Sequence, residues 1–257
     1  MNLDQSSEHV QLRSEVRNFV LTHRQGAPDN SNARANLKSP EILRWQKLLV
    51  ERGYAGRTIP KKYGGFGAPF DPMAGHIIAE EFGKERLHPG IVGQGISMLI
   101  PILLKRGTEE QKDKFIKETL LGNIIWCQGY SEPEAGSDLA SLRTEAVLDG
   151  DDWIINGQKI WTSTAHIADW MFCLVRTEPE APKHKGISFL IFPMSTPGIE
   201  VRPLKTMTGD ASFNEVFFSD VKVPAGQIVG ERGEGWKVAT ALLGHERSML
   251  GDPNVTQ

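Results

Sequence analysis

The pattern of apolar residues changes within the stretch Gly122-Asn123-Ile124-Ile125-Trp126-Cys127-Gln128-Gly129-Tyr130-Ser131-Glu132-Pro133-Glu134-Ala135-Gly136-Ser137-Asp138. On its amino-terminal side, apolar residues recur at the three- and four-residue spacing of amphipathic helices. From Ile124 onward they form short or alternating runs divided by turn-forming residues, as strands do. The chain is therefore expected to be helical up to Gly122 and rich in β-strands after it.

Several segments before Gly122 carry the signals of helix ends. Ser39 is a candidate N-cap, with Pro40 at the first helical position. Thr108 and Gln111 have the spacing of a capping box. Together with the apolar periodicity, these signals predict helices over residues 8–23, 40–50, 72–87, 93–104 and 109–120.

The second part of the chain predicts a β domain. Strands are expected over residues 124–129, 143–148, 153–161, 170–175, 187–192 and 216–223. Parallel βαβ units need helices between the strands, and the sequence has no helical pattern there, so an antiparallel sandwich or barrel is expected. A helical pattern returns over residues 235–250.

The predicted fold class is α+β. An all-helical N-terminal domain over residues 1–123 is expected to precede a middle β domain over residues 124–232. Residues 233–257 are expected to be the start of a further, truncated helical domain, because an apolar helix with nothing after it needs a partner surface.

Composition fits a folded globular chain and excludes several classes. Hydrophobic residues make up 39% and charged residues 24%, so the chain can bury a core and is neither disordered nor collagen-like. The 29 basic and 32 acidic residues are mixed along the chain, with a net charge of −3, so no surface for nucleic acid is expected. An anionic ligand must then be bound through local contacts.

Cysteine usage and the N-terminus favour a cytoplasmic protein. Cys127 and Cys173 lie in apolar runs without metal-ligand or CxxC spacing, so neither a metal site nor a disulfide is expected. The N-terminus lacks an apolar signal segment, and no apolar run approaches membrane-spanning length. No membrane partner is therefore expected.

Two segments can carry chemistry. In residues 128–138 a strand runs into a loop whose backbone N–H groups, together with the hydroxyls of Ser131 and Ser137, can bind a ligand. In residues 159–166, Trp161 offers a flat apolar face to a planar ring, and the hydroxyl side chains after it can bond ring heteroatoms. Taken by themselves, both segments are equally compatible with an ordinary strand connection and a strand end.

The order of several motifs gives the chain a family resemblance. The motifs are Ser131-Glu132-Pro133-x-Ala135-Gly136-Ser137-Asp138, Ile155-Asn156-Gly157-x-Lys159-x-Trp161, Val221-Lys222-Val223-Pro224 and Glu246-Arg247. Each is weak alone. In this order, and across essentially the whole chain, they resemble the acyl-CoA dehydrogenase family.

The resemblance implies that FAD lies against the β domain and that acyl-CoA enters between this domain and the helices. Ser131 would bond the isoalloxazine edge, Ser163 would lie near the flavin N5, and Ser137 and Arg247 would contact the substrate. The full set of residues implied to bind the cofactor is Gln128, Tyr130, Ser131, Ser137, Trp161, Thr162 and Ser163.

Other positions receive no role. Residues 207–212 and 244–245 depart from the family's pattern, so no substrate contact is carried over from them. No metal ligand and no catalytic residue is assigned. His166 and His245 have no evident carboxylate or metal partner in the sequence, and such histidines are more often structural.

The implied reaction is FAD-dependent α,β-dehydrogenation of an acyl-CoA thioester to a trans-2-enoyl-CoA, as in fatty acid β-oxidation, with an electron-transfer flavoprotein as acceptor. The family's base is a glutamate of a C-terminal helical domain that this chain lacks, so the chain alone is expected to be inactive.

Three alternatives stay open. The first is a fragment of a dehydrogenase, and the second is a non-catalytic flavin- and acyl-CoA-binding subunit whose partner supplies the helical domain. The third is a related flavin oxidase or monooxygenase. A homo-oligomer, or an assembly with such a partner, is expected.

Overall fold

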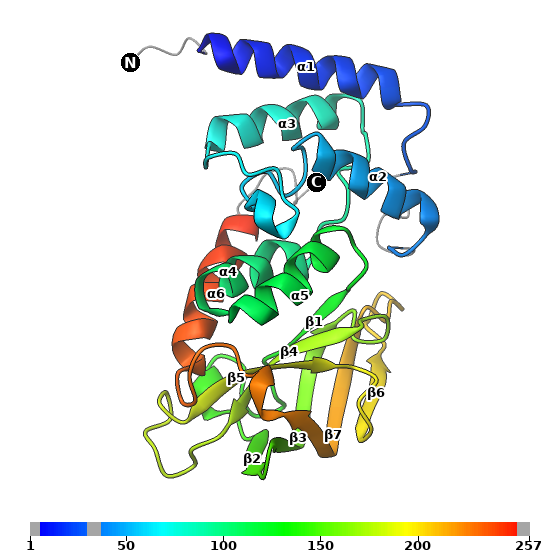
Figure 1. The fold of residues 1–257 in the computed structure, drawn as a ribbon. Helices are drawn as coiled ribbons and strands as arrows, with labels where there is room; N and C mark the ends of the chain where they lie inside the picture. The colour runs from blue at the N-terminus through cyan, green and yellow to red at the C-terminus, as the bar shows by residue number, and fades with distance from the viewer. Residues whose placement is uncertain (1–5, 30–36, 251–257) are drawn as a thin grey trace. The chain divides into compact units, whose positions relative to one another are not determined.

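The computed structural model describes residues 6–29 and 37–250, with side chains described as far as Gly244 (Figure 1). Contacts between Cα atoms divide the chain into two compact units. The first, the helical unit, contains the residues up to Val92 together with Leu120–Asn123. The second, the sheet unit, contains Gly93–Thr119 and Ile124–Met249. The domain boundaries expected at 123/124 and 232/233 stay predictions.

Among the residues that the structure describes, three α-helices build the helical unit, namely α1 (Ser7–His23), α2 (Pro40–Glu51) and α3 (Pro72–Lys84). The Ser39 hydroxyl accepts a hydrogen bond from the Ile42 amide at 3.2 Å, which confirms the predicted N-cap of α2. The apolar faces of the helices meet in one core, formed by Val16, Phe19, Val20, Trp45, Leu49, Ile78, Phe82 and Leu87.

The helices of the sheet unit lie beside its strands. A short π-helical segment (Gly95–Leu99) leads into α4 (Ile100–Arg106), which is followed by α5 (Glu109–Leu120). The predicted capping box is confirmed, because Thr108 and Gln111 exchange backbone-to-side-chain hydrogen bonds of 3.1 and 3.2 Å. Phe115 of α5 packs edge-on against two tryptophans of the strands, Trp126 at 5.4 Å and Trp170 at 4.7 Å.

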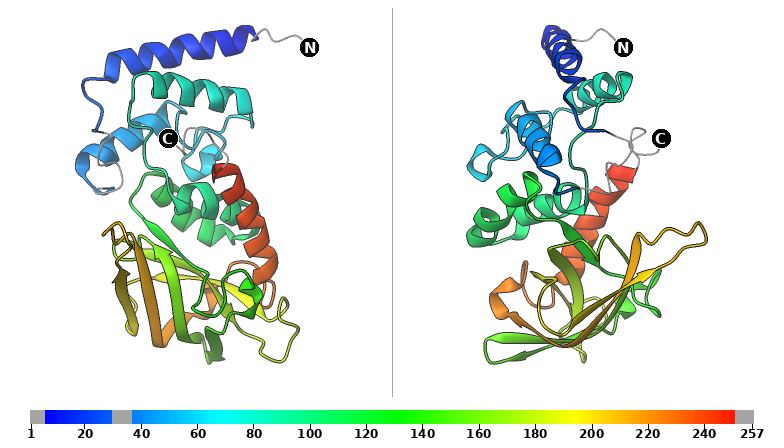
Figure 2. Two further views of the ribbon diagram at one scale, coloured as in Figure 1. Left: turned by 180° about the vertical axis from the view of Figure 1, so that it is seen from behind. Right: turned by 90° about the vertical axis from the view of Figure 1, so that its right-hand side faces the viewer.

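Seven strands form one curled sheet, followed by helix α6 (Gly235–Leu250) (Figures 1 and 2). Strand β4 pairs with β5 on one side and with β1 and then β2 on the other, and the sheet continues through β3, β7 and β6. The strands are β1 (Trp126–Gly129), β2 (Glu145–Asp149), β3 (Asp152–Ser163), β4 (Trp170–Arg176), β5 (Ile187–Pro193), β6 (Ile199–Leu204) and β7 (Phe213–Pro224).

The order of helices, sheet and final helix confirms the predicted fold class, with two differences in the sheet. First, the sheet is mixed, because β1 runs parallel to β4, with Trp126 paired to Trp170. The β2–β3 hairpin lies between these two strands in sequence and supplies the long connection that a parallel pair requires.

The second difference is β6, which the sequence did not predict. Within the described part of the chain, this strand pairs with β7 alone and forms the edge of the sheet. It carries Glu200, Arg202 and Pro203, residues that blunt an edge strand and hide the apolar signal of a strand.

No helix within the described ranges is both long and apolar enough to cross a membrane.

Candidate functional site

A β-bulge in β3 shapes the centre of the candidate site. Lys159 pairs with Val216 of β7, and Thr162 pairs with Asn214, so three steps along β3 face two steps along β7. The extra residue interrupts the alternation of the strand, in which Trp153, Ile155 and Lys159 all point inward. Without the bulge, Trp161 would have followed this inward series.

The bulge turns Trp161 outward. Its φ angle is 58°, in the left-handed region that bulky residues rarely occupy, and its side chain is 59% exposed. This backbone conformation costs about 1–2 kcal/mol in an L-residue other than glycine. Thr164, three residues later, is also left-handed, with φ 61°. Two strained residues within one short segment that presents a large aromatic ring are a feature of functional sites.

The loop that begins at Ser131 lies directly against this bulge. The amide of Ile160 donates a hydrogen bond of 2.9 Å to the carbonyl oxygen of Ser131. The segment around Ser131 and the segment Trp161–Ser163, which are about thirty residues apart in sequence, are therefore neighbours. The structure thus brings together the two motifs that the sequence singled out.

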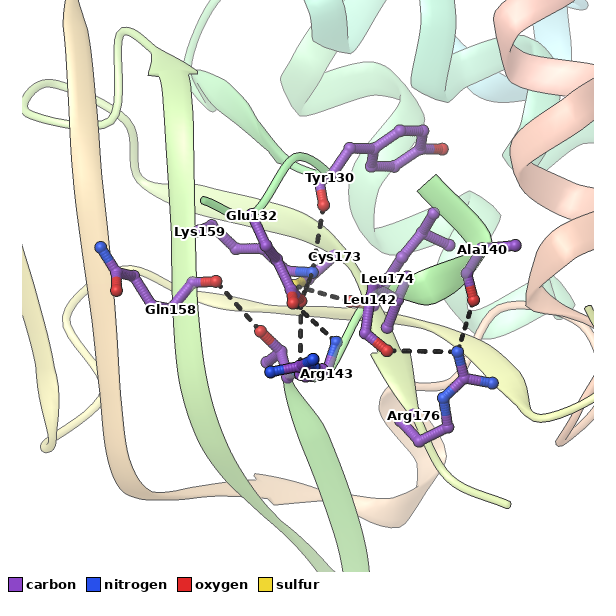
Figure 3. A network of polar contacts seen from close by, with 11 residues as sticks. Tyr130, Glu132, Ala140, Leu142, Arg143, Gln158, Lys159, Cys173, Leu174 and Arg176 are labelled. Atoms are coloured by element: carbon purple, nitrogen blue, oxygen red, sulfur yellow. Dashed lines mark hydrogen bonds and ion pairs between the residues drawn. The ribbon is translucent and has the colours of Figure 1, made fainter. Parts of the chain in front are cut away.

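Beneath the bulge lies a buried ion pair (Figure 3). The ammonium group of Lys159 donates to the Glu132 carboxylate at 2.7 Å and to the carbonyl oxygen of Tyr130 at 3.2 Å. Lys159 is fully buried and Glu132 is 8% exposed. A lysine side chain is almost never fully buried unless it is paired, so the buried position of Lys159 depends on its pairing with Glu132.

Glu132 also fixes the last residues of the loop that it begins. Its carboxylate accepts backbone hydrogen bonds from Arg143 at 2.6 Å and Thr144 at 2.9 Å. Burial raises the pKa of the Glu132 carboxyl, but the Lys159 charge and the hydrogen bonds that the carboxylate receives outweigh burial, so the net pKa lies below its ordinary value. Glu132 is therefore an ionised group that closes the loop over residues 132–144.

The tip of this loop, halfway between its two anchored termini, is exposed, so the base at Glu132 is the fixed end of the loop and the tip is its exposed end. Ser137 is exposed, and its neighbour Asp138 forms an ion pair of 2.8 Å with Lys183 in the β4–β5 connection. Both charged side chains are at least half exposed. The hydrogen bond from Lys183 lowers the pKa of Asp138, and a hydrogen bond from Ser141 adds to the effect.

Unpartnered polar atoms lie just behind Trp161. Thr162 and Asn214 are fully buried, and among the described residues neither the Thr162 hydroxyl nor the Asn214 side-chain oxygen has a hydrogen-bond partner. The Asn214 amide nitrogen donates to the Thr162 carbonyl oxygen at 2.9 Å and lies 3.2 Å from Nδ1 of His166. Buried polar atoms without partners are rare in folded proteins, and a bound ligand or water is one of the arrangements that completes their bonding.

An open cavity of about 640 Å³ adjoins the segment after Ser163. Its walls come from the turn before β4 and from the region after β5, and they combine apolar side chains with a few polar ones. The lining residues are Ala165, His166, Ala168, Asp169, Trp170, Pro193, Met194, Ser195 and Val201. This mixture of an apolar wall and a few polar groups is typical of small-molecule sites.

The remaining predicted residues are spread around this centre. Gln128, at the end of β1, accepts a hydrogen bond of 3.3 Å from Gln94, and Tyr130 is buried edge-on against Phe172 and Phe189. Ser163 is half-buried. Arg247 belongs to α6, but its side chain lies outside the described residues, as does that of His245.

The described residues offer no metal site and no reactive thiol. Among them, no group of three or more His, Cys, Asp or Glu side chains is placed to hold a metal ion. Cys127 and Cys173 are free and fully buried, and burial raises the pKa of both thiols, that of Cys173 to about 12.

Sequence reasoning missed the partners of the predicted residues. Lys159, Glu132 and Asn214 received no role, although they fix the positions of Ser131 and Thr162. A signal existed for Lys159, which has the same strand parity as the buried Trp153 and Ile155 and was therefore placed to face inward. Asn214 gave no such signal, because the bulge decides which residue it meets.

Comparison with known proteins identifies the class to which this fold and site belong. Residues 6–123 match the family profile described as acyl-CoA dehydrogenase, N-terminal domain, and residues 127–221 match the profile of the acyl-CoA dehydrogenase middle domain. The chain belongs to the acyl-CoA dehydrogenase family.

Individual relatives are similar over most of this chain. The acyl-CoA dehydrogenases IpdE1 and FadE29 of Mycobacterium tuberculosis are 42% identical over 207 residues and 36% identical over 252 residues. These matches cover 80% and 98% of this chain, and 53% and 64% of the relatives. The chain thus spans about half to two thirds of the length of these two relatives, and 30% of the length of FadE34 from the same organism.

Solved structures agree with this assignment. The Tcur3481-Tcur3483 steroid ACAD superposes with a TM-score of 0.79 at 36% identity, covering 96% of this chain and 63% of that one. The ChsE4-ChsE5 complex from Mycobacterium tuberculosis gives a TM-score of 0.76 at 35% identity, covering 95% and 61%. The second structure is described as a complex, and the name of the first also joins two components.

Proposed function

We propose that this chain forms the flavin- and acyl-CoA-binding part of an enzyme that converts an acyl-CoA thioester to a trans-2-enoyl-CoA. The observation that carries the proposal is the bulge of β3, which presents Trp161 and lies hydrogen-bonded against Ser131. A flat aromatic face next to hydroxyl groups fits a planar, heteroatom-rich ring. FAD, the cofactor implied by family membership, has such a ring.

The residues around the bulge fit a flavin in two respects. The indole of Trp161 is exposed, and the strained left-handed backbone of this residue directs it outward, so its face is open for stacking. The half-buried Ser163 offers a hydroxyl to a ring heteroatom. Thr162 is proposed as a second hydroxyl contact, whose fully buried side chain, without a hydrogen-bond partner within the described residues, has to turn toward the ring. Ser131, Ser163, Gln128 and Tyr130 are proposed to line the same cofactor. When bound, FAD supplies the acceptor for the hydride of the reaction.

The substrate is proposed to approach from the exposed end of the loop. Ser137 lies there, free of the buried contacts that fix Ser131, and it would serve both the cofactor and the CoA portion of acyl-CoA. Arg247 of α6 is proposed as a second contact. Because the net charge of the chain is −3, binding of the anionic CoA depends on such local groups rather than on the overall field.

The chain's own residues bind and orient in this proposal, and none is assigned as the base. Removal of the proton next to the thioester carbonyl requires a base within hydrogen-bond reach. We propose that this group comes from a helical domain outside the chain, and that an electron-transfer flavoprotein accepts the electrons. A cytoplasmic role in fatty acid β-oxidation is part of the same proposal.

A second candidate is a binding subunit of a two-component enzyme. The names of the Tcur3481-Tcur3483 and ChsE4-ChsE5 structures support it, because each names two components. The superpositions on these structures cover 96% and 95% of this chain. In this version a partner chain supplies the helical domain and the base. The candidate substrates in this version are CoA thioesters of straight, branched and steroid-side-chain acyl groups.

The experiment records the visible spectrum of the purified chain with FAD and then adds acyl-CoA of several chain lengths and an artificial electron acceptor. Bound flavin that bleaches only when a helical-domain partner is added supports the two-component version. Flavin that binds without bleaching supports a fragment that lacks its base. Oxygen consumption would instead support a flavin oxidase.

Matched variants make this experiment specific to the site. Trp161→Gly should weaken FAD binding about tenfold, which is within the contribution of one stacked aromatic ring. Phe70→Ala removes another exposed aromatic side chain, in the helical unit, and should leave FAD binding unchanged. Equal FAD affinity for the wild type and Trp161→Gly would contradict the proposed site.

A further inference from the structure

We infer that Lys159 is a positioning residue that clamps the Ser131 segment onto the bulge of β3, and thereby sets the place of Ser131 relative to Trp161. The inference rests on the proposed function for its flavin readout, but its geometric part concerns the chain alone. It assigns a role to the buried pair of Lys159 and Glu132, which touches no proposed ligand directly.

The clamp consists of consecutive contacts between two short segments. Lys159 bonds the residue before Ser131, through the Tyr130 carbonyl oxygen, and the residue after it, through the Glu132 carboxylate. The next residue of β3, Ile160, bonds the Ser131 carbonyl oxygen through its amide. Three successive loop residues are thus tied to two successive strand residues. The Ser131 backbone has little freedom to shift along β3.

The same ammonium group lies two residues before Trp161. The Lys159–Val216 pair is the last regular pair before the bulge, so Lys159 sits at the point where β3 departs from β7. Ile160 lies inside the bulge, between the two register positions, and donates to the loop at Ser131. The Ile160 amide, which is not in register with a residue of β7, therefore donates its hydrogen bond to the loop. The bulge and the loop stabilise each other through this bond.

Stability alone does not account for a charged pair at this place. A buried ion pair is often no more stabilising than apolar side chains of similar volume, because removing both charges from water costs as much as their attraction returns. The pair instead fixes the relative positions of the two segments, because the ammonium has to bond both a carbonyl oxygen and a carboxylate in one geometry. An apolar side chain at position 159 could fill the space without fixing Ser131.

The test is the double variant Glu132→Gln/Lys159→Met, measured as the full chain. It removes both charges and keeps approximately the volume of each side chain. We expect cooperative unfolding to persist, while hydrogen exchange of the Ile160 amide in the flavin-free chain becomes at least about tenfold faster. With FAD as the probe, we expect about tenfold weaker binding and an altered visible flavin spectrum.

The matched control is Glu200→Gln/Arg202→Met. It removes an exposed ion pair of 2.7 Å from β6 in the same sheet, and it should change neither the exchange of Ile160 nor the flavin spectrum. A double variant of the buried pair with wild-type exchange at Ile160 would overturn the inference. A clamp variant that binds FAD with wild-type affinity and spectrum would do the same.

A second variant keeps the inference testable if the double variant does not fold. Lys159→Arg retains the charge, but its larger planar group cannot occupy the fully buried position of one ammonium between Tyr130 and Glu132. It should also accelerate exchange at Ile160, and wild-type exchange would overturn the inference. If the wild-type chain takes up no FAD, the proposed function fails for the chain alone, and the exchange measurement still decides the clamp.

Discussion

The fixed end and the exposed end of the loop over residues 130–144, which are its base and its tip, are held by the same kind of interaction in opposite surroundings. At one end, Lys159 pairs with Glu132 at 2.7 Å, and both side chains are buried. At the other end, Lys183 pairs with Asp138 at 2.8 Å, and both are at least half exposed. The distances are almost equal, so burial is the main difference between the two ion pairs.

This comparison indicates what each end of the loop is built for. The buried pair is surrounded by further hydrogen bonds and joins the loop to a strained strand, so it fixes the direction of Ser131. The exposed pair is screened by water and holds Ser137 only loosely. A fixed end suits a cofactor that stays bound, and a loosely held end suits a substrate that enters and leaves.

The largest expected effect comes from breaking the buried pair on one side only. Lys159→Met leaves the Glu132 carboxylate buried without its counter-charge, and the free energy of unfolding should fall by about 3–5 kcal/mol. Denaturant unfolding measures this change. A loss as small as that of the exposed Arg202→Met variant would show that water already reaches Glu132, and the contrast between the two ends would disappear.

A smaller effect, which depends on pH, is expected from Glu132→Gln. The substitution should cost about 1–3 kcal/mol at pH 7, less than Lys159→Met, because the charged acceptor is lost but the amide oxygen of Gln can still accept a hydrogen bond from Lys159. The pKa of Glu132 is lower in the folded chain than its ordinary value, so its ionised form stabilises the fold above about pH 4.3 and this contribution is lost as the pH falls. Unfolding curves of the wild type and the variant should therefore converge on acidification. A difference that stays constant with pH would exclude this cause.

Trp161→Gly separates function from stability at the fixed end. Glycine relieves the strain of the left-handed backbone but adds entropy to the unfolded chain, so the free energy of unfolding should change by less than about 1 kcal/mol. Thermal unfolding of the flavin-free chain checks this value. A large destabilisation would mean that Trp161 is a packing residue, held by its edge contact with Phe213.

The smallest effect is expected at the exposed end. Asp138→Asn removes the ion pair with Lys183, and the midpoint of denaturant unfolding should stay within experimental error. Binding of acyl-CoA, followed by titration, should change at most a few-fold and should depend on salt. Destabilisation comparable to that of Glu132→Gln would show that the two ends of the loop are equivalent.

Much of the fold could be predicted because local signals were strong. The capping residues Ser39, Thr108 and Gln111 make the bonds that their positions in the sequence imply. The edge strand β6 and the parallel pairing of β1 with β4 could not be predicted in this way. Both depend on which strand lies next to which, and apolar periodicity does not report that relation.

The candidate site likewise has a part that could be predicted from the sequence and a part that could not. The residues from Ser131 to Ser137 and from Trp161 to Ser163 could be singled out from the sequence, because their residue types and order carry the family's pattern. Their proposed roles stay predictions. The orphaned Thr162 hydroxyl and the contacts of Asn214 were not predictable, because they result from one extra residue in β3.

The sequence by itself determined the succession of the helices and of the strands other than β6, the family and the inward parity of Lys159, since these follow from local spacing and residue type. Only the tertiary structure decided that Trp161 faces outward, that Ser131 lies against Ile160, and that the Lys159 charge finds Glu132. The physical reason is that a bulge and a buried ion pair are each defined by two segments at once, and the spacing within one segment contains no information about its partner.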